Sequence, residues 1–329
     1  MGGEGASVGG GAVPSSTAVA RGARTLSPLA DSIAQRLVFA PVGEEWFVAA
    51  GRARRLLVDL GRLDVELGKD SLRRQAYREA VAAGSPVPLG TRLQLRGPWG
   101  SDAATVAGFD AWNGRIVATL EAAPRVDSMA RVMDPLVVAA RRLARPRADP
   151  NAPSSPGTAR GSADRTAAGE GNASTADGDG AVPACRQPAD PAFLAQLAAL
   201  ARATEDSLRS APDQPIYARL RNALKARRSV ATGCFGPARG VVIVTLYAGD
   251  YEWVRERILL VGDTRTVRAT VRDLRFRAHE ALHALDADGD GVDDLAARAW
   301  TPRGGGTVIL RLGDGPRFER LASGFAWER

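Results

Sequence analysis

Apolar residues recur every three or four positions in several segments of the chain, and most of these segments begin with a helix-capping residue. Ser and Asp accept hydrogen bonds from the first free N–H groups of a helix, and Pro fits its first turn. The sequence therefore predicts five helices. They begin at Ser27-Pro28, at Asp70 (ending near Ala83), at Asp134-Pro135 (ending near Leu143), at Asp190-Pro191 and at Pro215 (ending near Arg228).

Other segments show the alternation of apolar and polar residues that is typical of half-buried strands. An Asn-Gly pair at Asn113-Gly114 separates two such runs, and it predicts a hairpin because both turn positions require a positive φ. Beyond Cys234 the strand pattern dominates. The predicted strands are Glu44–Ala50, Arg54–Val65, Thr91–Arg96, Thr105–Leu120 around the turn, Val241–Tyr247, Trp253–Val261, Val267–Val271, Thr307–Leu312 and Arg317–Trp327.

Two polar segments interrupt these patterns. Residues 1–26 are rich in Gly and Ser, and residues 147–183 contain no aromatic residue and no Leu, Ile or Met. Such segments cannot bury enough apolar surface to offset the entropy lost on folding, so we predict disorder in both. The predicted fold class is α+β, with two domains that each mix helices with a small, mainly antiparallel sheet. The first domain covers 27–146, and the second, at 184–329, opens with a helix pair.

The chain carries a net charge of +7, but its basic residues lack the pattern of a nucleic-acid binder. All but two of the 44 basic residues are Arg, and they are scattered among 37 acidic residues. None of the denser Arg clusters alternates with the aromatic side chains on which single-stranded bases stack. We therefore expect a solvated basic surface, and an Arg-driven nucleic-acid binder is the less favoured hypothesis.

The two cysteines, Cys185 and Cys234, lie just before and just after the predicted helix pair. The ends of such a pair approach each other, which favours a disulfide over two separate buried thiols. A disulfide implies an oxidising compartment. The first 23 residues show no secretory signal, so we expect either a cytoplasmic protein or a leader upstream of this start. No apolar run is long enough to predict a transmembrane helix.

The segment DADGDGVDD, from Asp286 to Asp294, predicts a calcium site. Calcium prefers six to eight oxygen ligands, and carboxylates at alternate positions converge on one ion if the backbone coils between them. Two glycines permit that coiling. The predicted ligands are the carboxylates of Asp286, Asp288, Asp290 and Asp294 and the carbonyl of Val292. A flexible acidic turn is the alternative.

This spacing, continued by Leu295, resembles the calcium loops of FG-GAP and VCBS repeats. It departs from an EF-hand, which requires an apolar residue and a Glu where this chain has Asp293 and Ala297. The resemblance implies a structural ion in a loop between two strands, and it implies an extracytoplasmic protein. It covers about ten residues and a single loop, so it does not extend to the propeller fold of those repeats.

Directly upstream, His279-Glu280-Ala281-Leu282-His283 resembles the HExxH motif of zincin metalloproteases. On a helix, His279 and His283 share one face and bind zinc, while Glu280 acts as the general base. The apolar positions of 274–285 fit a helix or a strand, and Asp286 starts the acidic loop three residues after His283. We therefore favour exposed histidines over a zinc site.

These patterns together favour a non-catalytic, calcium-stabilised binding or scaffolding protein outside the cytoplasm, with an unknown protein or cell-surface ligand as its partner. The alternative is a zinc-dependent hydrolase or peptidase that uses residues 279–283.

Overall fold

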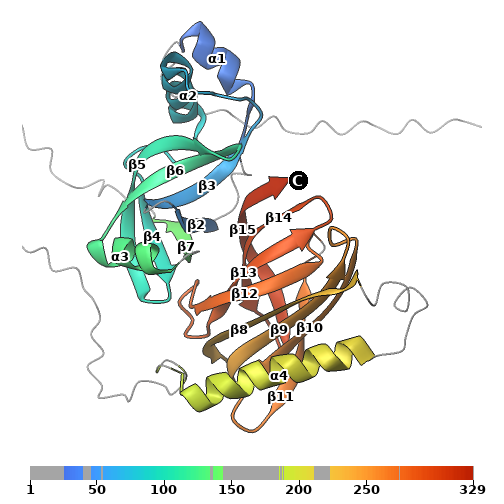
Figure 1. The fold of residues 1–329 in the computed structure, drawn as a ribbon. Coiled ribbons are helices and arrows are strands. Elements are labelled where there is room, and N and C mark those ends of the chain that lie inside the picture. The colour runs from blue at the N-terminus through green and yellow to red at the C-terminus, as the bar shows by residue number, and fades with distance from the viewer. Residues whose placement is uncertain are drawn as a thin grey trace, which may run out of the picture.

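The computed structural model describes residues 26–39, 46–52, 55–133, 136–143, 185, 187, 189–210, 223–273 and 275–328. Their strands and helices form two units that lie side by side (Figure 1). The segments for which disorder was expected, 1–26 apart from Leu26 and 147–183, lie outside the described residues.

The first unit is a β-sheet of seven strands with three helices, counted over the described residues. Two of its helices carry the predicted caps: Ser27 accepts a hydrogen bond from the N–H of Ala30, and Asp70 accepts one from Leu72. The elements are α1 (Pro28–Ala34), β1 (Leu37–Phe39), β2 (Trp46–Arg52), β3 (Arg55–Leu63), α2 (Ser71–Gly84), β4 (Arg92–Gly97), β5 (Gly100–Trp112), β6 (Arg115–Ala122), α3 (Pro124–Val132) and β7 (Val137–Arg142).

The sheet of the first unit closes into an antiparallel barrel. Its strand order is β1-β3-β2-β7-β4-β5-β6, and β3 also pairs with β6, so every strand except β1 belongs to the ring. Strands β5 and β6 form the predicted hairpin, with φ values of 46° at Asn113 and 70° at Gly114. Inward-facing residues such as Leu56, Leu93 and Ile116 fill the barrel.

The second unit is an eight-stranded sheet with one helix in the described part of the chain. The strand order is β12-β13-β14-β15-β11-β10-β9-β8, and every pairing is antiparallel except the parallel pair β11–β15. The elements are α4 (Pro191–Ser210), β8 (Lys225–Phe235), β9 (Ala238–Ala248), β10 (Trp253–Val261), β11 (Thr266–Arg272), β12 (Ala278–Leu285), β13 (Asp294–Thr301), β14 (Gly304–Leu312) and β15 (Arg317–Glu328).

This sheet folds over so that its two edge strands meet. The N–H of Ala281 on β12 donates to the hydroxyl of Ser229 on β8, at 2.8 Å. The core between the two halves contains Phe235, Val241 and Leu310, among other buried residues. Helix α4 covers the outer face of β8, β9 and β10, where Leu197 packs on Val242 and its neighbours.

The two units share an apolar interface between the outside of the barrel and the outer face of β12–β15. Val48, Leu57 and Ala139 of the first unit pack there with Ile309 and Phe325 of the second. Figure 1 shows β15 beside β2 and β3 at this contact. Strands β2, β3 and β7 are therefore buried on both faces.

The fold is mainly β, so the predicted α+β class is wrong. Strands take up 53% of the described residues and helices 22%. Two predicted helices are strands where the structure describes them, since Val137–Arg142 forms β7 and Lys225 opens β8. Because β7 faces the barrel core on one side and the second unit on the other, it has no polar face. A short apolar run of this kind cannot be distinguished from a buried helix by periodicity alone.

Candidate metal site

The predicted calcium loop joins β12 and β13 and lies next to the first unit. Gly289 and Gly291 shape the loop with φ values of 85° and 88°, which residues with a side chain rarely adopt. A Cβ atom on Gly289 would also overlap the guanidinium of Arg96, on β4 of the barrel. The backbone conformation therefore favours glycine at position 289, and a larger residue would also displace the Arg96 side chain.

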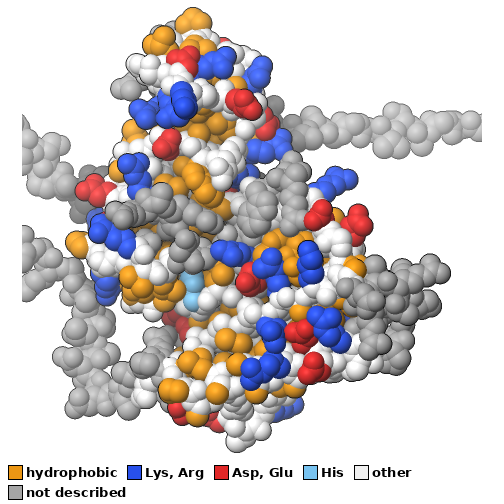
Figure 2. Space-filling model, viewed as in Figure 1, with side chains coloured by type: hydrophobic (Ala, Val, Ile, Leu, Met, Phe, Trp, Pro, Cys, Tyr) orange, Lys and Arg blue, Asp and Glu red, His pale blue; other side chains and the backbone are white. Residues whose placement is uncertain are grey.

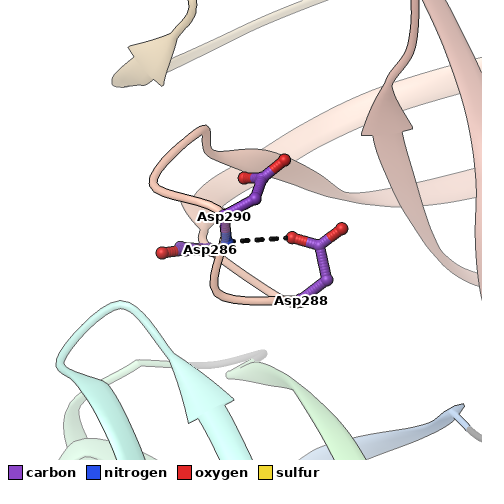
Figure 3. Close-up of side chains that lie close together, drawn as sticks. All are labelled: Asp286, Asp288 and Asp290. Atoms are coloured by element: carbon purple, nitrogen blue, oxygen red, sulfur yellow. Dashed lines mark hydrogen bonds between the residues drawn. The ribbon is translucent and has the colours of Figure 1, made fainter.

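The aspartates of the loop coil the backbone by accepting its N–H groups. Asp286 accepts from Gly289 at 2.7 Å and from Gly291 at 3.3 Å through its two carboxylate oxygens. Asp288 accepts from the N–H of Asp290, as Figure 3 shows, and Asp290 accepts from Val292 at 2.8 Å. As a result, one oxygen each of Asp286, Asp288 and Asp290 lies within 4.8 Å of the others. The loop thus brings together three of the predicted ligands in a group that could hold a metal ion.

Asp294, the fourth predicted carboxylate, begins β13 and is 2% exposed. Its Oδ2 accepts the N–H of Ala287 at 3.1 Å. Burial, together with the nearby charges of Asp288 and Asp290, raises the pKa of Asp294 to about 8. A buried carboxylate with acidic neighbours is costly to ionise unless a cation balances the charge. The Arg311 guanidinium, 3.6 Å from Asp288, supplies part of that balance.

The predicted carbonyl ligand, Val292, lies on the same turn. Its N–H binds Asp290, and its side chain is partly buried.

The end of the loop is fixed to β8 beside the disulfide. Cys185 and Cys234 form the predicted disulfide, with Cα atoms 5.0 Å apart. The backbone N–H of Cys234 donates to the Asp293 carboxylate at 2.5 Å, and the N–H of Asp293 donates to the carbonyl of Cys234 at 2.7 Å. Hence the loop is held between the disulfide-bonded strand on one side and Arg96 of the barrel on the other.

The HExxH residues lie on strand β12, not on a helix, and their side chains meet different partners. His279 is 3% exposed, and its Nδ1 lies 3.0 Å from Glu256 on β10. The Nε2 atom of His283 lies 2.8 Å from the carbonyl of Val137 in the first unit. Glu280 pairs with Arg227 at 3.4 Å. The ring nitrogens of both histidines therefore make polar contacts within the fold, and the prediction of exposed surface histidines is wrong.

Only one convergent group of three or more His, Cys, Asp and Glu side chains occurs in the described residues, and it is the aspartate cluster of the loop. In the described residues, His279, Glu280 and His283 do not converge with a further His, Cys, Asp or Glu side chain that could act as a third zinc ligand.

Three residues that contact these sites were missed in the sequence. Glu256 carried a signal, because it occupies an inward position of β10 in phase with Ile258 and Leu260. A charged residue in an apolar phase indicates a buried partner. Arg96 and Arg311 carried none, since both resemble the many exposed Arg residues and Arg96 comes from the other unit.

In the view of Figure 2, the surface has no area of a single charge, because Lys and Arg side chains are interspersed with Asp and Glu. No helix in the described ranges is long and apolar enough to span a membrane. No protein-family model, curated protein or solved structure matches the chain.

Proposed function

We propose that the chain is a non-catalytic binding or scaffolding protein that works outside the cytoplasm and is stabilised by one calcium ion. The ion would be held in the loop by the carboxylates of Asp286, Asp288, Asp290 and Asp294 and by the carbonyl of Val292. The observation that carries the proposal is the convergence of three carboxylates within 4.8 Å beside a fourth that is almost fully buried.

The chemistry of the donor set favours calcium over zinc. All the donors are oxygens, which suit hard cations, whereas zinc sites in proteins draw on Cys and His. A divalent ion would also offset the burial and the acidic repulsion that together raise the pKa of Asp294. The resemblance of the loop to FG-GAP and VCBS calcium loops points the same way.

Two properties support the proposed location: the disulfide beside the loop and the affinity expected of such a calcium site. The loop is attached to a disulfide, and disulfides persist in oxidising compartments. Calcium sites in extracellular modules bind with dissociation constants of about 10⁻⁴ to 10⁻³ M, which suits calcium levels outside cells. Both properties support a role outside the cytoplasm.

Calorimetry with the chelator-treated full chain tests the site. Calcium should bind one-to-one with a Kd of about 10⁻⁴ to 10⁻³ M. Asp288→Asn and Asp290→Asn should each weaken binding at least about tenfold, because each removes a charged ligand. The matched control is Asp314→Asn, which changes an exposed aspartate in the β14–β15 turn and should leave calcium binding unchanged. At about 100 times the Kd, calcium should raise the free energy of unfolding by about 2.7 kcal/mol.

The alternative, a zinc hydrolase, predicts a different outcome. Zinc would then bind stoichiometrically, His283→Ala would abolish zinc binding, and Asp288→Asn would not. Glu280→Gln would in addition remove any hydrolytic activity. That combination of results would overturn the calcium proposal.

A further inference from the structure

A cavity of about 680 Å³ opens at one end of the second unit, where its strands turn. The β8–β9, β10–β11 and β14–β15 turns surround it, and Val292 of the calcium loop lines one side. This volume falls within the range of about 300–1,000 Å³ that is typical of small-molecule sites, which are often found in the mouths of β-barrels.

The inner surface of the cavity is apolar. Phe235, Ala238 and Leu260 form the buried part of the cavity wall, and Val267 and Leu312 form its partly exposed part. Phe235 is held in place by an edge-to-face contact with Phe318, with ring centroids 6.4 Å apart. An apolar hollow that meets solvent is costly to leave filled with water, and such hollows commonly mark binding sites.

Hydrogen bonds within the turns preform the opening. The N–H of Gly262 donates to the carbonyl of Arg265 at 2.8 Å, and the N–H of Gly313 donates to Arg317 at 2.8 Å. The surrounding turns are therefore fixed without a ligand, so that binding costs little ordering of the backbone.

The opening carries one charge without an ion-pair partner in the described residues. Asp263 and Arg265 both line the cavity, but Asp263 pairs with Arg239 at 2.8 Å. Arg265 is exposed and has no such pair among the residues that the structure places. Asp314, in the neighbouring turn, is not among the lining residues. Among the described lining residues, Arg265 is therefore the one charged side chain that no ion pair balances.

We propose that this cavity binds a small amphiphile, with an aliphatic chain against Phe235 and Leu260 and an anionic group at the opening beside Arg265. The inference names a ligand class for the binding role proposed above. Of the residues that line the cavity, only Val292 is also a proposed calcium ligand, and the amphiphile contacts do not use it, so the two proposals can fail separately.

Calorimetric titration of the full chain with octanoate, decanoate and dodecanoate tests the apolar part of the site. Binding should be saturable and one-to-one. Each added methylene should raise the affinity about fourfold, which corresponds to about 0.8 kcal/mol, until the chain outgrows the cavity. Val267→Arg, which places a charge in the wall, should abolish binding while the circular dichroism spectrum is retained. Leu312→Phe, a milder filling change, should reduce the affinity for dodecanoate more than for octanoate.

Decanol, a neutral ligand of the same chain length, tests the anionic part. Decanoate should bind about two- to fivefold more tightly than decanol, which is the range for an exposed ion pair. Arg265→Gln should remove that difference. Arg268→Gln changes the net charge equally at an exposed position on β11 that does not line the cavity, and it should leave the difference intact.

Several results would overturn the inference. The affinity could be independent of the length of the aliphatic chain, or Val267→Arg and Leu312→Phe could both bind as well as the wild type. The two Arg variants could have equal effects, or the protein could sediment with anionic vesicles and yet not bind free decanoate. The titrations are repeated with calcium and with EDTA. If decanoate binds as described but calcium does not bind, the calcium site is wrong and the amphiphile site stands.

Discussion

Replacing Asp59 should destabilise the protein more than replacing an equally well-paired aspartate at the surface. Asp59 lies on the outer side of β3, at a bulge opposite β6. Its carboxylate forms an ion pair with Arg115 at 2.9 Å and accepts the N–H of Gly61 at 3.0 Å. It also accepts the N–H of Phe325, so that it joins the barrel to the last strand of the second unit. The Asp59 side chain is 3% exposed and that of Arg115 is 18% exposed.

The size of the effect follows from burial. Asp59→Ala leaves a largely buried guanidinium without its counter-charge and two backbone N–H groups without an acceptor. Removing one partner of a buried pair costs about 3–5 kcal/mol, a large share of a total stability of about 5–15 kcal/mol. The chain offers a matched control in Asp64, which pairs with Arg62 at 2.7 Å, but with side chains 41% and 52% exposed. Asp64→Ala should therefore cost only about 0–1 kcal/mol.

Equilibrium unfolding in urea measures both changes. Far-UV circular dichroism follows the sheets, and tryptophan fluorescence follows tertiary packing, including the interface, where Trp112, one of six tryptophans, packs edge-to-face on Phe325 with ring centroids 6.1 Å apart. Asp59→Ala should lower the midpoint strongly with both probes, and the fluorescence change should come first if the interface opens before the barrel unfolds. If the two alanine variants differ by less than about 1 kcal/mol, the argument from burial is refuted.

Three further predictions concern single features of the fold. Replacing Cys185 and Cys234 by Ser should lower the free energy of unfolding by about 4 kcal/mol, given their separation of 49 residues in sequence, and wild-type protein unfolded in reducing agent should match the variant. Burial lowers the pKa of His283 below its ordinary value of 6.5, so at this site the unfolded chain binds more protons than the folded one; the contribution of His283 to stability should be constant above about pH 6.5 and be lost as the pH drops through the folded pKa, and thermal melts of His283→Gln compared with wild type across pH should isolate that contribution. Gly114→Val should cost about 1–2 kcal/mol in urea unfolding, because φ is 70° there, whereas Asn113→Gly at φ 46° should be nearly neutral; equal effects would contradict the turn assignment.

Local signals in the sequence predicted local structure well. The caps at Ser27 and Asp70 and the turn at Asn113-Gly114 depend on the backbone geometry of a few adjacent residues, and the structure has all three. The fold class failed where burial depends on distant partners. The run from Val137 to Ala140 is apolar because a barrel core and a second sheet cover its two faces, and nothing in its own sequence distinguishes this from a buried helix.

The candidate site divides in the same way. The alternate aspartates and the two glycines specify a coiled loop, and the structure brings Asp286, Asp288 and Asp290 together as expected. The surroundings of the loop could not be predicted, because Arg96 comes from the other unit and Asp293 binds the strand of Cys234. The HExxH spacing misled for a related reason, since its chemistry requires a helix and these residues pair with β13 in a sheet.

The bond between Asp59 and Phe325 spans 266 residues and so bears on the order in which the protein can form. Synthesis begins at the N-terminus, and the strands of the barrel emerge long before β15 does. Until then, the outer face made by residues such as Val48, Leu57 and Ala139 lacks the part of its cover that Ala322 and Phe325 of β15 provide. A nascent or truncated chain that stops before the last strand would present this apolar face to its neighbours, and exposed faces of this kind promote aggregation. The final strand thus protects a surface that the ribosome completed much earlier.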